Sequence, residues 1–117
     1  MMPKPHSTKP CLIIHGGAGN ISRTNLSPEA YTRYATELIV VNGETSHMLE
    51  NGATALDAAT HAVRLLEDCP LFNCGKGAVF TRDGTIELEA SVSEISAAWY
   101  WIFQISLCFV PICLFPF

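Results

Sequence analysis

A glycine-rich segment near the start of the chain is the first place where the sequence could do chemistry. His15-Gly16-Gly17-Ala18-Gly19 directly follows an apolar run, and three glycines in four positions let backbone N–H groups approach a substrate or a reacting carbonyl closely. A dinucleotide fingerprint would need its third glycine where Ser22 stands, and no Gly-Lys-Ser/Thr follows to make a phosphate loop. The spacing alone leaves two interpretations, backbone donors beside a reaction centre or an ordinary glycine turn, and it favours the turn.

A second segment, Leu66 to Gly77, combines Pro70 and two glycines with the apolar residues Leu71 and Phe72. Burial of those two apolar side chains would hold the loop in place. Its carbonyl groups could surround a monovalent cation, or the loop could simply connect a helix to a strand. Periodicity does not choose between these interpretations, and the simple connection is favoured.

The other candidate ligands and acids lack the spacing of a metal or acid–base site. His6, His47 and His61 have no second ligand at metal spacing, and the adjacent carboxylates Glu67 and Asp68 have no evident partner. The five cysteines are odd in number and contain no C-x-x-C pair, which predicts reduced thiols in a cytoplasmic chain and no zinc site. A net charge of -4 without a basic run argues against a nucleic-acid partner.

The elements that must position these segments begin with a strand and a helix. Cys11 to Ile14 is a short, β-branched apolar run that predicts a buried strand. Ser27-Pro28-Glu29 predicts a capped helix start, and the helix should run towards Glu50, where Asn51-Gly52 supplies a left-handed stop. The expected buried stripe of this helix is Tyr31, Tyr34, Ala35, Leu38 and Val41.

A second helix is expected from about Ala55 to Glu67. Thr54 and Asp57 resemble a capping box with the shorter acid. The expected buried stripe is Leu56, Ala59, Val63 and Leu66. The many alanines would let this helix lie close against a sheet, so the sequence predicts one layered α/β unit.

A hairpin is expected next. Ala78 to Thr81 and Ile86 to Val92 flank Arg82-Asp83-Gly84-Thr85, and Asp83-Gly84 is a strong hairpin turn signal. The second segment alternates, with its apolar residues on one face.

The composition changes sharply at Ile95. Residues 95–117 contain no charged side chain, and a run of this length nominates a membrane segment. Pro111 and Pro116 interrupt its second half, and no Lys or Arg flanks it. Two interpretations stay open, a membrane anchor or non-native sequence attached to a truncated globular protein, and the second is favoured.

Four stretches together resemble the plant-type L-asparaginase/isoaspartyl peptidase family. They are Ile-Ile-His-Gly-Gly-Ala-Gly-Asn-Ile-Ser (13–22), Gly-Ala-Thr-Ala-Leu-Asp-Ala (52–58), Ala-Val-Arg-Leu-Leu-Glu-Asp-Cys-Pro-Leu-Phe-Asn-Cys-Gly-Lys-Gly-Ala-Val-Phe-Thr-Arg-Asp-Gly (62–84) and Glu-Leu-Glu-Ala-Ser-Val (87–92). The resemblance implies an N-terminal-nucleophile hydrolase with an αββα sandwich. Such enzymes expose a threonine by self-cleavage and release aspartate from L-asparagine and β-aspartyl peptides.

The resemblance also implies site residues. His15, Gly16 and Gly17 would lie beside the nucleophile, and Asn73 would help to orient that centre. A structural sodium ion, and no organic cofactor, would be bound by the main-chain carbonyls of Leu66, Glu67, Cys69, Phe72, Cys74 and Lys76.

After Val92 the chain departs from the family pattern. The segment that carries the nucleophilic threonine has no counterpart here, so we expect an N-terminal fragment that is inactive alone. The predicted organisation is a flexible segment 1–10, a partial asparaginase-like domain 11–94 and the apolar tail 95–117. Completion by a nucleophile subunit would allow asparagine or isoaspartyl peptide to bind, and the alternative is a non-catalytic fragment that is membrane-anchored or binds full-length subunits in a homo- or hetero-oligomer.

Overall fold

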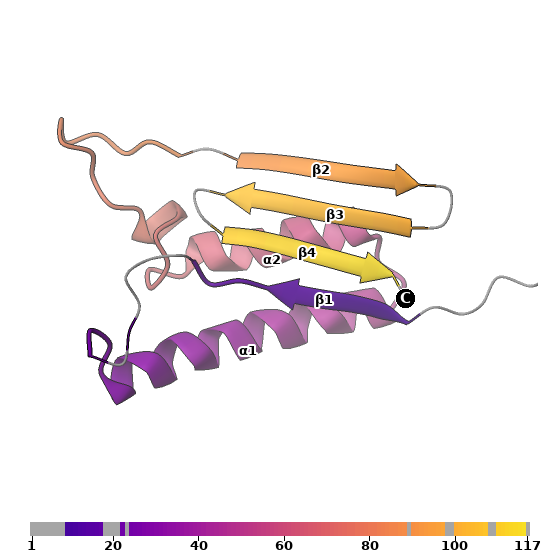
Figure 1. Ribbon diagram of the computed structural model, residues 1–117, viewed down its shortest axis with the longest axis horizontal. Coiled ribbons are helices and arrows are strands. Elements are labelled where there is room, and N and C mark those ends of the chain that lie inside the picture. Colours follow the sequence, from indigo (N-terminus) through magenta and orange to yellow (C-terminus); the bar gives the residue numbers. More distant parts are fainter. Residues whose placement is uncertain are drawn as a thin grey trace, which may run out of the picture.

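The computed structural model describes the backbone of residues 9–17, 22, 24–88, 90–97, 100–107 and 110–116. Side chains are described for residues 9–17, 22 and 24–88. Two helices lie on one face of a four-stranded antiparallel sheet with the strand order β1-β4-β3-β2 (Figure 1). The chain therefore has the mixed helix and strand composition that the sequence predicted.

The strands come from distant parts of the chain. They are β1 (Pro10–Ile14), β2 (Ala90–Ala97), β3 (Tyr100–Leu107) and β4 (Val110–Pro116). The register sets Leu12 of β1 opposite Leu114 of β4, and Ile105 of β3 opposite Ile112 of β4. The predicted strand Cys11 to Ile14 is confirmed, with Pro10 as its first residue, but its predicted burial is wrong, since Ile13 is 51% exposed and the others are half-buried or exposed.

Helix α1 (Pro28–Glu50) has the two ends that the sequence predicted. The Ser27 hydroxyl accepts a hydrogen bond from the backbone N–H of Ala30, which satisfies one of the unpaired donors of the first turn. At the other end Gly52 adopts a positive φ of 87°, and the N–H groups of Gly52 and Ala53 donate to the carbonyls of Leu49 and Met48. This pair of bonds is a Schellman motif.

Helix α2 (Ala55–Asp68) begins at a reciprocal cap. Thr54 accepts a hydrogen bond from the N–H of Asp57 and donates its own hydroxyl hydrogen to the Asp57 carboxylate. Ala58, Ala59 and Ala62 are fully buried, and the helix packs on β3 and β4. Leu56 was expected on this face but is 42% exposed, because the buried face of α2 runs through Ala55, Ala58, Ala59 and Ala62 and leaves Leu56 outside it.

The core lies between the helices and the loop that follows α2. Its buried side chains are Val41, Ala59, Ala62, Val63, Leu66, Phe72 and Cys74. Leu12 and Ile14 of β1 pack against this cluster. Thr45 is fully buried and satisfies its hydroxyl by donating to the carbonyl of Val41 at 2.7 Å.

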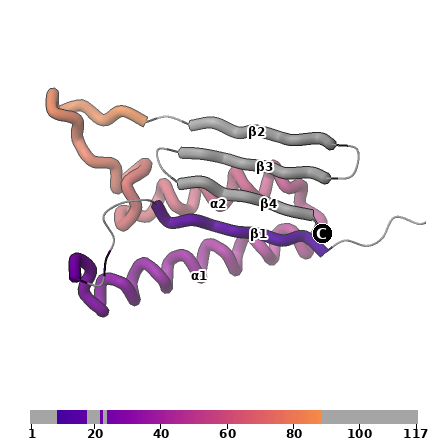
Figure 2. The backbone as a smooth tube through the Cα atoms, in the orientation of Figure 1, coloured from indigo at the N-terminus to yellow at the C-terminus, as the bar shows by residue number. Residues whose placement is uncertain are grey.

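The expected hairpin does not form, although its turn does, and the last residues of its second strand, 90–92, lie in β2. Gly84 has a positive φ of 76°, and the N–H of Thr81 donates to the carbonyl of Thr85 at 2.7 Å. Residues 78–88 contain no strand, and regular pairing begins only at Ala90. Val79 and Phe80 are 66% and 70% exposed, so no apolar layer covers them and stabilises a strand there. The segment projects beyond the sheet (Figure 2).

The described residues of the predicted tail 95–117 form the end of β2 and the strands β3 and β4. Within the described part of the chain, no helix combines the length and the apolar character needed to cross a membrane. Of the predicted flexible segment 1–10, only Lys9 and Pro10 belong to the described residues.

Candidate functional site

The glycine segment leaves β1 and turns beneath the first turns of α1. A Cβ atom on Gly16 would lie 3.0 Å from Leu38 Cδ1 and 3.2 Å from Phe72 Cε1, so the main chain lies against those two side chains. Gly17 has a φ of 122°, which favours glycine, and its N–H donates to Nδ1 of His15 at 3.2 Å. Ala18 and Gly19, the last residues of the motif, lie outside the described residues.

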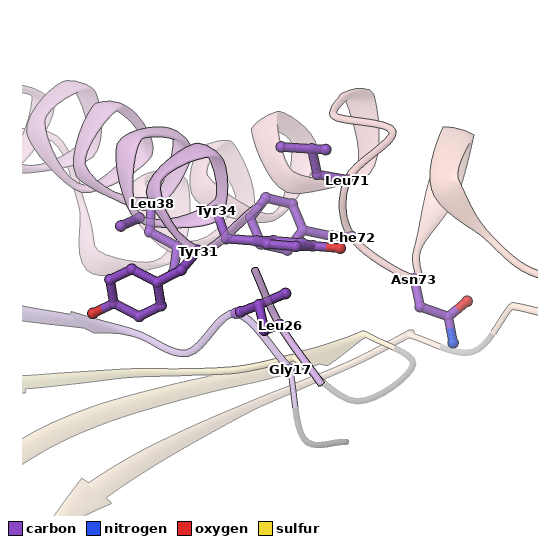
Figure 3. Close-up of a pocket in the computed structure, with 10 residues that line it drawn as sticks. Gly17, Leu26, Tyr31, Tyr34, Leu38, Leu71, Phe72 and Asn73 are labelled. Carbon is purple, nitrogen blue, oxygen red and sulfur yellow. The ribbon is translucent and has the colours of Figure 1, made fainter. Parts of the chain in front are cut away.

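Asn73 is an exposed residue in the loop after α2. Its side-chain oxygen accepts a hydrogen bond from the N–H of Val79 at 3.0 Å, which ties the two sides of the loop together. Gly16, Gly17 and Asn73 all line one cavity of about 500 Å³ (Figure 3). The structure thus brings these three predicted site residues together, whereas the His15 side chain is exposed and does not line the cavity.

Most of the cavity wall is apolar, and α1 contributes more of its residues than any other element. Its lining is Gly16, Gly17, Leu26, Tyr31, Tyr34, Ala35, Leu38, Leu71, Phe72 and Asn73. The rings of Tyr34 and Phe72 meet edge to face, with centroids 5.8 Å apart at 68°. Leu26, Tyr31 and Leu71 were not predicted as site residues. The tyrosines were expected in a buried stripe, but Tyr31 is 64% exposed and stands at the rim.

In the loop from Leu66 to Gly77, several carbonyl groups contact other residues of the same loop. The carbonyl of Leu66 accepts from Cys69 N–H and from the Cys74 thiol, which is 1% exposed. A Cβ on Gly77 would lie 2.7 Å from the carbonyl oxygen of Pro70 and would also collide with that of Phe72. A Cβ atom on Gly75, which has a φ of 48°, would likewise collide with the carbonyl group of Glu67. The carbonyl oxygens of Glu67, Pro70 and Phe72 therefore lie so close to Gly75 and Gly77 that no side chain larger than a hydrogen atom fits at these two positions.

Side chains offer no comparable cation site. No group of three or more His, Cys, Asp or Glu residues gathers within the described residues. The chemistry of the loop is thus that of neutral, hard oxygen donors, which suit alkali and alkaline-earth cations. The carbonyls of Cys69, Phe72 and Cys74 accept hydrogen bonds from the N–H groups of Phe72, Cys74 and Gly77, respectively.

An ion pair closes this loop on its outer side. Lys76 Nζ lies 2.7 Å from Asp68 Oδ1, so the short helix η1 (Gly75–Gly77) is joined to the last residue of α2. The hydrogen bond from Lys76, then its charge, and more weakly the charge of Arg64, lower the pKa of the Asp68 carboxyl.

This pKa shift gives a testable pH dependence. A carboxyl whose pKa is lower in the folded chain stabilises the fold above its unfolded pKa, and that contribution is lost as the pH falls through the folded value, below about pH 4. We expect Lys76→Met to raise the Asp68 pKa towards the ordinary aspartate value, measured by NMR titration of the carboxyl carbon. Arg82→Met, at an exposed base in the turn, is the control; an unchanged Asp68 pKa in Lys76→Met would contradict the assignment.

The comparisons with known proteins agree with these motifs. A family model described as asparaginase matches residues 8–98. The isoaspartyl peptidase of Salmonella typhimurium is 54% identical over 86 residues, which are 74% of this chain and 28% of that protein. The isoaspartyl peptidase of Escherichia coli is also 54% identical over 86 residues, covering 74% and 27%. The plant-type L-asparaginase of Pyrococcus horikoshii is 40% identical over 81 residues, covering 69% and 25%.

A glycine segment after a first strand and a carbonyl-rich loop after a second helix thus define the class of protein. The chain belongs to the asparaginase family. It spans about a quarter of the length of the curated relatives it matches.

Proposed function

We propose that this chain supplies the first part of an amidohydrolase that releases aspartate from L-asparagine and from β-aspartyl peptides. The observation that carries the proposal is the meeting of Gly16, Gly17 and Asn73 at one cavity in a chain that is 54% identical to isoaspartyl peptidases. The nucleophile would be a threonine from a segment that this chain does not include, exposed by self-cleavage. The chain alone is therefore expected to be inactive.

In the proposed reaction the threonine hydroxyl attacks the side-chain amide carbon of the substrate, and the amine of the same threonine takes the hydroxyl proton. Backbone N–H groups of the glycine segment would face the reacting carbonyl and stabilise negative charge on its oxygen. The N–H of Gly17 donates to His15 Nδ1, so a substrate oxygen would have to replace that ring nitrogen. Ammonia or an amino acid then leaves, and water hydrolyses the ester.

Asn73 would act as a positioning residue. Its oxygen is already bound by the N–H of Val79, which fixes the side chain and leaves the amide NH₂ to orient a neighbouring group. Asn73→Asp keeps the shape and the acceptor while removing those donors. It should therefore lower kcat in a completed enzyme more than it changes folding.

A sodium ion is the proposed inorganic component. The carbonyls of Leu66, Glu67, Cys69, Phe72, Cys74 and Lys76 would hold it. The carbonyl oxygens of Glu67 and Phe72, which lie close to Gly75 and Gly77, support two of these ligands. The Leu66 carbonyl accepts from Cys69 N–H and from the Cys74 thiol, so it would have to give up one of these bonds to bind the ion. We expect a higher Tm in sodium chloride than in choline chloride at equal ionic strength, and equal values would contradict it.

A chimeric enzyme tests the proposed amidohydrolase function. Residues 9–88 of this chain replace the matched segment of the Salmonella enzyme, and aspartate release from a β-aspartyl dipeptide is measured. We expect activity in the chimera, none in the full chain of 117 residues by itself, and reduced kcat in the chimera with Asn73→Asp. A folded, self-cleaved chimera without hydrolysis would reject the proposed function.

A further inference from the structure

The carbonyl group of Leu66, near the end of α2, accepts hydrogen bonds from two different kinds of donor. In a continuing α-helix this carbonyl would accept from the N–H four positions on, but that residue is Pro70, which has no N–H. The N–H of Cys69 donates to it instead, at 3.3 Å. The thiol of Cys74, eight positions along the chain, donates the second bond at 3.4 Å. A side chain of the following loop therefore completes the cap of this helix.

The thiol bond is the one of the two that the Leu66 carbonyl can lose more easily. Leu66 and Cys74 are each 1% exposed, so little water is available to replace either bond. A thiol is a weaker donor than a backbone N–H. Its hydrogen turns away by rotation about a single bond, whereas loss of the Cys69 bond would move the main chain at the end of α2.

We propose that the Cys74 thiol regulates the proposed sodium site by holding the Leu66 carbonyl when no ion is bound and releasing it to the ion. This inference rests on the proposed function, in which the Leu66 carbonyl is one of the sodium ligands. A carbonyl oxygen has two lone pairs, so with two hydrogen bonds it has none left for a cation. Binding exchanges one S–H···O hydrogen bond for one contact between sodium and oxygen, and no covalent bond forms or breaks. Cys74 is thus a positioning residue whose side chain acts through Leu66.

Sodium binding to variants of the full chain tests this role. Cys74→Ala and Cys74→Val both remove the donor, and valine also keeps bulk in the core and suits the extended backbone at this position (φ −154°, ψ 158°). Each should lower the Kd for sodium, measured from sodium NMR line widths, by about threefold or more, since no hydrogen bond then competes for the carbonyl. Each should also enlarge the rise in Tm from choline chloride to sodium chloride. Comparing the two salts within one variant cancels any change in its basal stability.

Two substitutions are the matched controls. Cys74→Ser keeps a donor at the same position, so it should not bind sodium more tightly than the wild type. Cys11→Ala removes a half-buried thiol from β1, outside the loop, and should leave the Kd for sodium unchanged.

The infrared S–H stretching band gives a readout that a purely structural role would not change. The band of Cys74 is identified by its absence from Cys74→Ala. It should move to higher frequency when sodium is added to the wild type, because the thiol then loses its acceptor.

Each outcome decides the proposal. If the wild type, Cys74→Ala and Cys74→Val bind sodium equally, or if the band does not move while sodium raises Tm, the role of the thiol is overturned and the sodium site stands. If sodium affects none of the chains, both are rejected, whereas hydrolysis by the chimera tests the amidohydrolase separately.

Discussion

Gly77→Ala should destabilise the chain by about 3 kcal/mol, because the new methyl group would overlap backbone carbonyls that cannot move aside. The nearest oxygens belong to Phe72 and Pro70, which are held in the loop that carries the buried Phe72 ring. Urea unfolding followed by circular dichroism measures the change. The same methyl group would also disturb the proposed sodium ligands, so the sodium dependence of Tm should vanish with it.

Gly43→Ala is the matched control for that substitution. It adds the same methyl group in open space on α1 and should stabilise the chain by about 1 kcal/mol through helix propensity. Opposite signs for the two glycines are therefore expected. A loss below about 1 kcal/mol at Gly77 would mean that the loop relaxes around the methyl group and that its close carbonyl packing is not required.

Phe72→Ala should cost about 4 kcal/mol, the largest effect expected of a single side chain. Phe72 is 2% exposed, contacts Tyr34 edge to face and closes the wall beside Gly16. Its removal joins a buried void to the cavity and frees the loop that presents Asn73. We therefore expect a lower urea midpoint together with loss of activity in the chimera.

Phe80→Ala removes an equal number of atoms from a side chain that is 70% exposed. Its effect should stay within about 0.5 kcal/mol. If both phenylalanines cost the same, burial in this structure does not govern stability, and the arrangement of the loop around Phe72 is wrong.

Local signals predicted the helices well. Ser27 and Thr54 cap their helices as their sequence context indicated, and Gly52 ends α1 in the left-handed region. These features depend on residues within one turn of each other, so the sequence contains all the information they need. The alanines of α2 likewise identified the helix that lies close to the sheet.

Long-range pairing could not be predicted in the same way. The alternation around Asp83-Gly84 indicated two paired strands, but Val79 and Phe80 have no apolar layer to cover them. The turn formed without the hairpin, and residues 90–92 of the second segment pair with β3 instead. Strand pairing depends on partners far along the chain, which local alternation does not specify. The partner of β1 lies in the apolar tail, whose composition suggested a membrane segment or foreign sequence.

The same contrast between local and long-range information applies to the candidate site. Spacing alone left the glycine segment and the loop after α2 as ordinary turns, and only the family resemblance indicated that both belong to one centre. Tyr31 reaches the cavity because the start of α1 lies beside the glycine segment, and Leu26 comes from the turn just before that helix. Tertiary packing sets the angle at which a helix crosses a strand, so a local sequence pattern does not predict that angle.

The pairing of β1 with β4 joins residues about a hundred positions apart, since Pro10 lies opposite Pro116. During synthesis on the ribosome, β1 emerges first and must wait for the last strand before its backbone is paired. Loop-closure entropy makes such a contact slow to form, whereas the hairpin of β2 and β3 can form early. The nascent chain would therefore expose an apolar, unpaired strand throughout its translation, when a chaperone that recognises extended apolar segments could bind it.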